Sequence, residues 1–486
     1  MTVVFAIDAG TTGVRTRAVF PDGRPSVSAY REFTQHFPRP GWVEHDADEI
    51  WSAARETLSE VSAIVGEPPA AIGITNQRET VIVWDKRNGR PVARAIVWQD
   101  RRTAERCTEL APYLPLVRRT TGLVLDPYFS GTKAAWLIEN SDVPAEEHMA
   151  IGTVDTWLVW KLTGGKSFVT DPSNASRTML FDINSMQWSR DMCNLIGVPL
   201  SCLPDVRPSS GRLGVTSGVD GLADGVPVSG IAGDQQAALF GQACTSPGMA
   251  KNTYGTGSFV LLNVGRKCPD PTEGMLTTVA WDLGNGPTYA LEGSIFVTGA
   301  AVQWLRDGLG IIKNSSDIGP LAASVPDTGG VYVVPAFTGL GSPWWDPYAR
   351  GTIVGITRGT TAAHIARAVV ESMVFQTRDA VEAMTSAGGV KLTELRVDGG
   401  ASVMDPMLQM QADELGVPVL RPVDHETTAL GAAYLAGLAE GVWSSLEDIG
   451  RMWSLDARFT PGQESGRHST WRRAVERSLR WADVSG

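Results

Sequence analysis

The chain has 486 residues, of which 43% are hydrophobic and 20% are charged, and its formal net charge is −11. These are globular proportions, and the length exceeds what a single hydrophobic core usually supports, so two domains are expected. The acidic balance excludes a protein that binds nucleic acid by nonspecific electrostatic attraction. A locally basic segment, residues 467–481, has the pattern of an amphipathic helix that closes the fold.

The five cysteines are widely spaced and include no C-x-x-C pair, which favours reduced thiols over disulfides or a zinc site. The first residues lack a basic stretch and reach an acid at Asp8, which is not the pattern of a signal peptide. No apolar run approaches the roughly 18 residues of a membrane span. The sequence therefore predicts a soluble, cytoplasmic protein.

The first predicted element is a hairpin. An apolar run at residues 3–7 leads through Asp8-Ala-Gly-Thr-Thr-Gly-Val-Arg15 into a second strand at residues 16–20. The turn between them has small residues, two hydroxyls and backbone N–H groups that are free to meet a ligand. Asp46 is then expected to cap a helix that carries one apolar face as far as Val65.

Four polar residues interrupt the strand-like stretch from Gly73 to Asp85. Apolar and β-branched residues on both sides predict two strands, with Asn-Gln-Arg-Glu at residues 76–79 as their connection. Turns are normally built from Gly, Asn, Asp or Pro, and Asn76 is the one such residue here. A solvated turn with an incidental charge pair would also explain Arg78 and Glu79, so these residues alone leave their role open.

The middle of the chain contains a second strand-to-helix junction. Residues 209–225 are expected to form loops or surface helices, and residues 226–233 form a buried-strand pattern that ends at Asp234. A helix is predicted over residues 235–241, with Asp234 as its N-cap, and the domain boundary is placed just after it, near residues 245–248.

The second half begins like the first. A strand at residues 249–254 leads through Gly255-Thr-Gly-Ser258 into another strand at residues 259–264, which suggests an internal duplication. Later, Asp398-Gly-Gly400 follows a strand and precedes a helix. Strands and helices alternate through both halves, which indicates the α/β class.

These three glycine turns, two in hairpins and one before a helix, are typical of phosphate contacts when they occur together. Each alone is weak evidence, because glycine turns are common for structural reasons. Their order suggests two hairpins that hold phosphates and a third turn that holds a nucleoside. No G-x-x-x-x-G-K-[ST] sequence is present, which argues against a P-loop NTPase.

Longer motifs surround these turns along almost the whole chain. They include AIDAGTTGVR (6–15), GITNQRETVIVWD (73–85), TGLVLDPYFSGTKAAWLIEN (121–140), TDPSNASRTMLF (170–181), SGIAGDQQAALFGQ (229–242), GMAKNTYGTGSF (248–259) and RVDGGA (396–401). The chain thereby resembles the glycerol kinases of the FGGY carbohydrate-kinase family. The resemblance implies two duplicated actin-like (ribonuclease-H-like) ATPase domains with a cleft between them. It places a polyol-binding domain at residues 1–245 and a nucleotide-binding domain at 246–486.

The resemblance also assigns roles to single residues on the polyol side. It implies that Asp234 is the general base for the attack of a terminal hydroxyl on the γ-phosphorus of ATP. The implied polyol contacts are Arg78, Glu79, Trp98, Tyr128, Asp234, Gln235 and Phe259. Such a set suits a triol, because recognition of hydroxyls needs donors, acceptors and an apolar wall for the carbon chain.

On the nucleotide side, the resemblance implies that Asp8 helps to hold Mg²⁺ through water. The residues that match phosphate and nucleotide contacts are Thr11, Thr12, Arg15, Thr256, Gly299, Gln303, Gly400 and Ala401. Relatives commonly form dimers or tetramers, so a homodimer or homotetramer is an expectation by analogy.

Two departures from the family pattern concern the site. Ala9 stands in the first turn where the family usually has Gln, and Asp100 replaces a small residue beside Trp98. Asp100 is expected to put an extra carboxylate near the substrate wall. A kinase for another acceptor, such as erythritol, threitol or xylulose, is therefore an alternative. A second alternative from a different class is an actin-like ATPase that switches conformation and modifies no small molecule.

Overall fold

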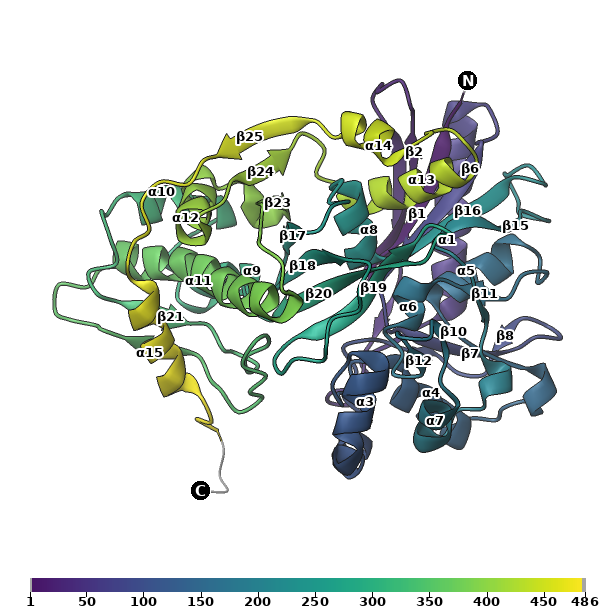
Figure 1. Cartoon of the computed structure of the whole chain (residues 1–486), viewed down its shortest axis with the longest axis horizontal. Helices are drawn as coiled ribbons and strands as arrows, with labels where there is room; N and C mark the ends of the chain where they lie inside the picture. The colour runs from purple at the N-terminus through teal and green to yellow at the C-terminus, as the bar shows by residue number, and fades with distance from the viewer. Residues whose placement is uncertain (1, 483–486) are drawn as a thin grey trace.

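The computed structural model describes residues 2–482 and contains two large sheets, one in each half of the chain (Figure 1). The first sheet has the strand order β15-β16-β6-β1-β2-β3. Its strands are β1 (Val4–Ala9), β2 (Gly13–Val19), β3 (Val27–Glu32), β6 (Ala71–Asn76), β15 (Ser210–Val215) and β16 (Pro227–Gly233). β1, β2 and β3 are antiparallel, whereas β6 runs parallel to β1 and β16 runs parallel to β6.

The second sheet has the order β19-β20-β18-β17-β23-β24-β25 and repeats the central pattern of the first. Its strands are β17 (Met249–Tyr254), β18 (Ser258–Gly265), β19 (Leu276–Asp282), β20 (Pro287–Ile295), β23 (Glu394–Gly399), β24 (Val419–Pro422) and β25 (Leu455–Phe459). Here β17, β18 and β20 are antiparallel, and β23 and β24 continue parallel to β17. The α/β class is thus confirmed, and the repeated strand order supports the predicted duplication.

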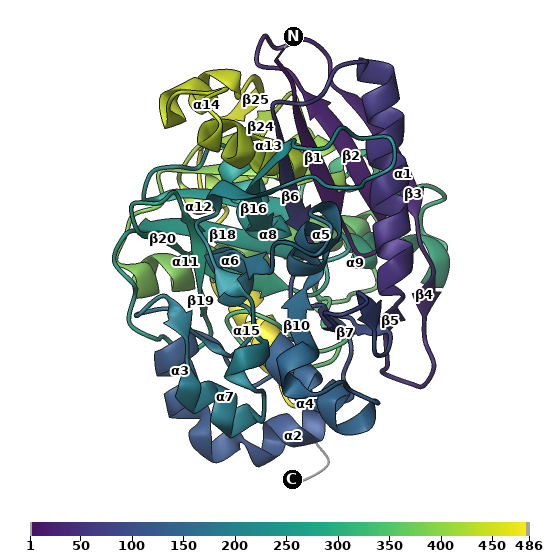
Figure 2. The ribbon, with the colours of Figure 1, turned by 90° about the vertical axis from the view of Figure 1, so that its right-hand side faces the viewer.

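Helices cover both sheets. The longer ones are α1 (Ala47–Val65), α4 (Ser130–Asn140), α5 (Val154–Leu162), α11 (Ala362–Gly388), α12 (Asp405–Leu415), α13 (Thr427–Ala439) and α15 (His468–Ser478). The shorter ones include α2 (Ala104–Glu109), α3 (Leu114–Thr121), α6 (Pro172–Ala175), α7 (Arg190–Ile196), α8 (Asp234–Gly241), α9 (Gly299–Gln303), α10 (Ile318–Ala323) and α14 (Leu446–Met452). α1 begins as predicted, because the Asp46 carboxylate accepts hydrogen bonds from the backbone N–H groups of Asp48 and Glu49, and it covers β2 and β3 (Figure 2).

Two helices at equivalent positions join the halves. α8 follows β16 and α13 follows β24, and the two helices pack against each other between the sheets (Figure 1). α13 belongs to the second half of the sequence, yet it lies on β1, β6 and β16 of the first sheet. The helices approach closely because glycine stands at the crossing: a Cβ at Gly431 would lie 2.6 Å from the carbonyl carbon of Ala237.

The strands on either side of residues 77–80 belong to different sheets. β6 lies in the first large sheet, whereas β7 (Val81–Asp85) pairs with β10 (Met149–Thr153) and β9 (Ala95–Ile96) in a smaller sheet. That sheet also contains β4 (Gln35–His36), β5 (Glu44–His45) and β8 (Arg90–Pro91). The predicted connection is therefore a buried crossing between two sheets and not a solvated turn.

One predicted element is wrong and another is confirmed. Residues 210–215 form edge strand β15 instead of a loop, because they pair with β16 and extend the first sheet. The basic C-terminal segment forms α15, which buries Trp471, Ala474 and Val475 on one face.

Within residues 2–482, no helix has both the length and the apolar character that a membrane crossing requires.

Candidate active site

The crossing between β6 and β7 fixes Arg78 and Glu79 in the interior, where each side chain is 2% exposed. Glu79 adopts φ 62°, a left-handed conformation that is uncommon for a residue with a side chain. The neighbouring backbone supports this turn, because Thr80 N–H donates to the Arg78 carbonyl at 2.7 Å and Ser130 Oγ donates to the Glu79 carbonyl at 3.0 Å. A held backbone of this kind is frequently found at functional sites.

Arg78 is surrounded by acceptors. Its Nη1 donates to Glu292 Oε2 at 2.5 Å and to Gln236 Oε1 at 3.1 Å, and its Nη2 donates to Glu292 Oε1 and to the Tyr128 hydroxyl, both at 3.2 Å. Nε forms ion pairs with Asp234 Oδ1 at 3.2 Å and with Glu79 Oε1 at 3.8 Å. Burial opposes a charged group, yet the neighbouring acidic groups raise the pKa of Arg78 well above its usual value.

Sequence reasoning missed Gln236 and two charged members of this cluster, Arg177 and Glu292. Both side chains are fully buried, and Arg177 donates from Nε to Glu79 Oε1 at 2.6 Å and from Nη2 to Glu292 Oε1 at 3.0 Å. Burial would raise the pKa of Glu292, but Arg177 and Arg78 lower it to about 2, so this carboxylate is ionised. Arg177 lies within the quoted TDPSNASRTMLF motif, which was the available signal for it, whereas Glu292 lies in a strand with no comparable cue.

Several polar atoms of the cluster are left free for a ligand. Glu79 Oε2 makes no hydrogen bond to any described residue, and Arg78 Nε meets the Asp234 and Glu79 carboxylates only through ion pairs. The Tyr128 oxygen accepts from Arg78, which only donates, so the Tyr128 O–H is free to donate. Lys251 Nζ donates to one end of the Gln235 amide, which identifies that end as the oxygen and leaves the NH₂ group as a free donor.

Aromatic rings enclose these polar atoms. Trp98 and Tyr128 pack edge to face with ring centroids 5.7 Å apart, and the Arg78 guanidinium carbon lies 5.9 Å from the centroid of Phe259. Phe259 belongs to β18 of the second sheet, so the wall is built from both halves. The predicted polyol residues Arg78, Glu79, Trp98, Tyr128, Asp234, Gln235 and Phe259 are thus connected by contacts.

Asp234 lies at the end of β16 and is the first residue of α8, with Gly233 in the N-cap position. The predicted N-cap is therefore wrong by one residue, although Asp234 Oδ1 still accepts from the Gln235 N–H at 2.7 Å. Its side chain is 29% exposed. Burial raises the pKa of Asp234 above its ordinary value, and Arg78 opposes this effect.

Asp8 lies close enough to Asp234 for their charges to interact. Burial and the Asp234 charge raise the pKa of Asp8 to about 7. A cation between two such carboxylates would relieve their repulsion, and oxygen ligands are those that Mg²⁺ prefers. Within residues 2–482 no group of three or more His, Cys, Asp or Glu side chains could hold a metal ion, so water and phosphate would complete the coordination, as is usual for Mg²⁺ at nucleotide sites. The residues present fit Mg²⁺ in that manner.

The first glycine turn is held against the polyol wall. Gly10 N–H donates to the Gly13 carbonyl at 3.0 Å, and Trp98 Nε1 donates to Thr11 Oγ1 at 3.0 Å. Thr12 is exposed, and its hydroxyl lies 3.3 Å from that of Tyr30. Arg15 forms an ion pair with Glu426 of the second half, so a phosphate at Arg15 would compete with this carboxylate.

The second glycine turn lies against the other predicted nucleotide residues. Gly255 N–H donates to the Gly257 carbonyl at 2.8 Å, and the N–H groups of Gly299 and Ala300 donate to the carbonyls of Gly255 and Thr256. The third turn adjoins the same tip, because Tyr254 pairs with Gly399 directly before Gly400 and Ala401. Thr256, Gln303 and Gly400 are exposed. A Cβ at Gly400 would meet nothing within 4 Å, which leaves its backbone open to a ligand.

Asp100 does not supply a free carboxylate beside Trp98. The residue is fully buried, and its oxygens accept from the backbone N–H of Val43 at 2.6 Å and from the Arg102 side chain at 2.8 and 2.9 Å. The Arg102 guanidinium carbon in turn lies 3.7 Å from the ring centroid of Trp42. The Asp100 carboxylate is therefore neutralised within a structural cluster. The argument for erythritol, threitol or xylulose as the phosphate acceptor assumed a free carboxylate at Asp100, so it no longer holds.

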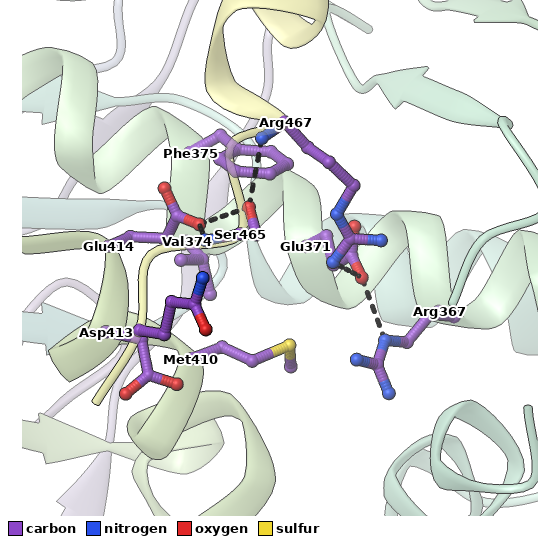
Figure 3. A pocket seen from close by; sticks show the side chains of 10 residues that line it. Arg367, Glu371, Val374, Phe375, Met410, Asp413, Glu414, Ser465 and Arg467 are labelled. Atoms are coloured by element: carbon purple, nitrogen blue, oxygen red, sulfur yellow. Dashed lines mark hydrogen bonds and ion pairs between the residues drawn. The ribbon is translucent and has the colours of Figure 1, made fainter. Parts of the chain in front are cut away.

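A separate pocket of about 160 Å³ lies in the second half, between α11, α12 and residues 463–467 (Figure 3). None of the predicted site residues lines it. Figure 3 shows Glu371 between two arginines: its Oε1 accepts from Arg367 Nε and from Arg467 Nη2, both at 2.8 Å. These pairs hold the segment before α15 against α11.

Known proteins match the chain over almost its whole length. Residues 3–241 match the N-terminal domain of the FGGY family of carbohydrate kinases, and residues 250–440 match its C-terminal domain. The chain is 54% identical to Glycerol kinase 2 of Thermotoga maritima, with 99% of each chain covered, and 54% identical to a glycerol kinase of Trichlorobacter lovleyi, with 99% and 100% covered. The structure of Plasmodium falciparum glycerol kinase with ADP is 35% identical and superposes with a TM-score of 0.93, covering 99% of this chain and 98% of that one. The protein belongs to the FGGY family of carbohydrate kinases.

Proposed function

We propose that the protein is a glycerol kinase, which transfers the γ-phosphoryl group of ATP to glycerol and makes sn-glycerol 3-phosphate. The observation that carries the proposal is the set of donors and acceptors around Arg78, Glu79, Tyr128 and Asp234, which lies beside aromatic rings and is joined to the first glycine turn by the hydrogen bond from Trp98 to Thr11. Relatives that are 54% identical over nearly the whole chain bear the name glycerol kinase, which supports the same activity.

Recognition of glycerol follows from the free atoms. Glu79 Oε2 accepts from one hydroxyl, while Arg78 Nε–H, the Tyr128 O–H and the Gln235 amide donate to the others. Trp98 and Phe259 contact the short carbon chain. Because all four N–H groups on the two Nη atoms of Arg78 already have acceptors, Nε–H is the part of this guanidinium that meets the substrate.

Asp234 takes the proton from the terminal hydroxyl as this oxygen attacks the γ-phosphorus. Burial raises its pKa and makes it a better proton acceptor than an ordinary carboxylate, while the Arg78 charge opposes that rise. The hydroxyls of Thr11, Thr12 and Thr256, the Arg15 guanidinium and the backbone at Gly299, Gly400 and Ala401 position the nucleotide, with Gln303 beside them. Mg²⁺, held near Asp8 through water, would neutralise phosphate charge during transfer.

The test is coupled ADP release by purified protein with Mg-ATP and glycerol, erythritol, threitol, xylulose or no acceptor. We expect a clear preference for glycerol, because a site that pairs every hydroxyl rejects analogues with misplaced ones. Preference for another acceptor would refute the assignment of glycerol but keep the kinase. ATP turnover that no acceptor stimulates would instead favour an ATPase switch.

The role of Asp234 is tested by Asp234→Asn, which preserves size and removes the base. We expect turnover to fall by about 10²- to 10⁴-fold, the range for loss of a general base, while KM for glycerol changes little. Asp220→Asn is the control, because Asp220 is exposed on the surface. Normal turnover in Asp234→Asn would refute the base assignment.

A cytoplasmic location and a homodimeric or homotetrameric state stay predictions.

A further inference from the structure

We infer that Glu292 is a positioning residue for the polyol site, and that it acts from the second half of the chain by holding Arg78 and Arg177 of the first. The inference rests on the proposed function, since it concerns how the same site is kept ready for its acceptor. Glu292 is fully buried on β20, whereas Arg78 lies in the β6–β7 crossing and Arg177 follows α6.

The contacts form one series of ion pairs in which acidic and basic side chains alternate. Glu79 is paired with Arg177, Arg177 with Glu292, Glu292 with Arg78, and Arg78 with Asp234. Glu292 lies in the middle of this series. Both of its oxygens accept hydrogen bonds from Arg78, at 2.5 and 3.2 Å, and Oε1 also accepts from Arg177 at 3.0 Å. Planar pairing through two parallel hydrogen bonds fixes the orientation of a guanidinium as well as its position.

The consequence for the substrate concerns the two residues at the ends of this series of ion pairs. Glu79 and Asp234 are the two carboxylates that the polyol needs as hydrogen-bond acceptor and base. With Glu292 present, the two arginines have a counter-charge of their own, so Glu79 Oε2 stays free and Asp234 meets only Nε of Arg78. Without Glu292, only the carboxylates of Glu79 and Asp234 would remain in this series to pair with the two arginines. Both arginines would then turn towards them and compete with the polyol.

Glu292 also links this geometry to the contact between the two halves. It enters from the second sheet together with Phe259, which lies opposite Ser294 on the neighbouring strand. Moving the halves apart would withdraw the Glu292 carboxylate from both arginines. The polyol contacts are therefore oriented fully when the second sheet is in place against the first half.

The experiment compares Glu292→Gln with the wild type in steady-state kinetics, varying glycerol and ATP separately. We expect kcat/KM for glycerol to fall by about tenfold or more, since a partner of a buried charge pair is lost, with KM for ATP within about twofold of wild type. Arg177→Lys, which keeps the charge but loses the second hydrogen bond, should give the same selective loss. Arg177→Lys therefore tests the same inference when Glu292→Gln does not fold.

The structure offers a matched control in Glu371, a buried glutamate that also bridges two arginines, but in the separate pocket (Figure 3). Glu371→Gln should lower the melting temperature and leave kcat/KM for glycerol within about twofold. The inference is overturned if folded Glu292→Gln loses less than about tenfold, if KM for ATP rises equally, or if Glu371→Gln shows the same loss. A wild type that phosphorylates no polyol would refute the proposed function as well. An active wild type with an unaffected Glu292 variant refutes this inference alone.

Discussion

The crossing of α8 and α13 gives the most demanding test of the fold, because it joins the halves directly behind the site. Substituting Gly431→Ala would drive a Cβ into the Ala237 carbonyl oxygen and place it 2.6 Å from the carbonyl carbon of that residue. Carbon atoms in contact prefer about 3.5–4.0 Å, so the helices would have to separate by at least about 1 Å. Neither side can yield by a rotamer change, since the obstructing atoms are backbone.

The cost follows from that separation. A gap of 0.5–1 Å forfeits roughly a quarter to a half of the dispersion energy across a packed contact, and overpacked cores typically lose about 1–3 kcal/mol. Because a backbone clash cannot relax locally, we expect a loss of about 3 kcal/mol, or a fall in Tm of roughly 3–6 °C for a chain of 486 residues. Asp234 is the first residue of α8, so turnover should also fall.

Thermal unfolding of Gly431→Ala is compared with that of Gly450→Ala. Gly450 lies in α14, and a Cβ there would meet nothing within 4 Å. The control should be slightly stabilised, by about 0.5–1 kcal/mol, because alanine favours helix more than glycine does. If Gly431→Ala melted at or above the temperature of Gly450→Ala, the close crossing of these helices would be wrong.

Three further predictions concern the site. The pKa of Asp8 is raised to about 7, so this group holds a proton below that pH and releases it above. Mg-nucleotide binding, which needs the charged form, should strengthen from about pH 6 to 8 in titrations of the wild type and stay flat in Asp8→Asn. Trp98→Phe removes the 3.0 Å hydrogen bond to Thr11 and keeps a smaller aromatic ring in the wall. It should raise KM for ATP and for glycerol by about 2- to 12-fold, as loss of one hydrogen bond predicts, and unchanged values in steady-state kinetics would contradict the coupling of the two sites. Asp100→Ser removes one of the two carboxylates that pair with Arg102 and leaves Glu44 in place, so denaturation should show a loss of about 1–3 kcal/mol. The acceptor panel should show an unchanged preference, and a changed preference would restore Asp100 as a specificity residue.

Much of the local structure could be predicted from the sequence. The two hairpins, the α1 cap at Asp46 and the strand that leads to Asp234 depend on neighbours in the chain, so their patterns are visible in short windows. The family and the kinase activity followed from long motifs, and the family models and relatives confirm both. The individual roles of the site residues stay predictions until the variants are measured.

The sequence by itself determined which residue types line the site: the Arg78-Glu79 pair, the carboxylate at Asp234 and the glycine turns are all contiguous motifs. The tertiary structure alone decided what these groups contact. β6 and β7 look like neighbours in the chain but enter different sheets, and Glu292 reaches Arg78 from 214 residues away. Likewise, Arg102 neutralises the Asp100 carboxylate that the sequence leaves looking free. The reason is physical: a buried charge must find its partner wherever packing places one, and packing between sheets is not encoded in any local pattern.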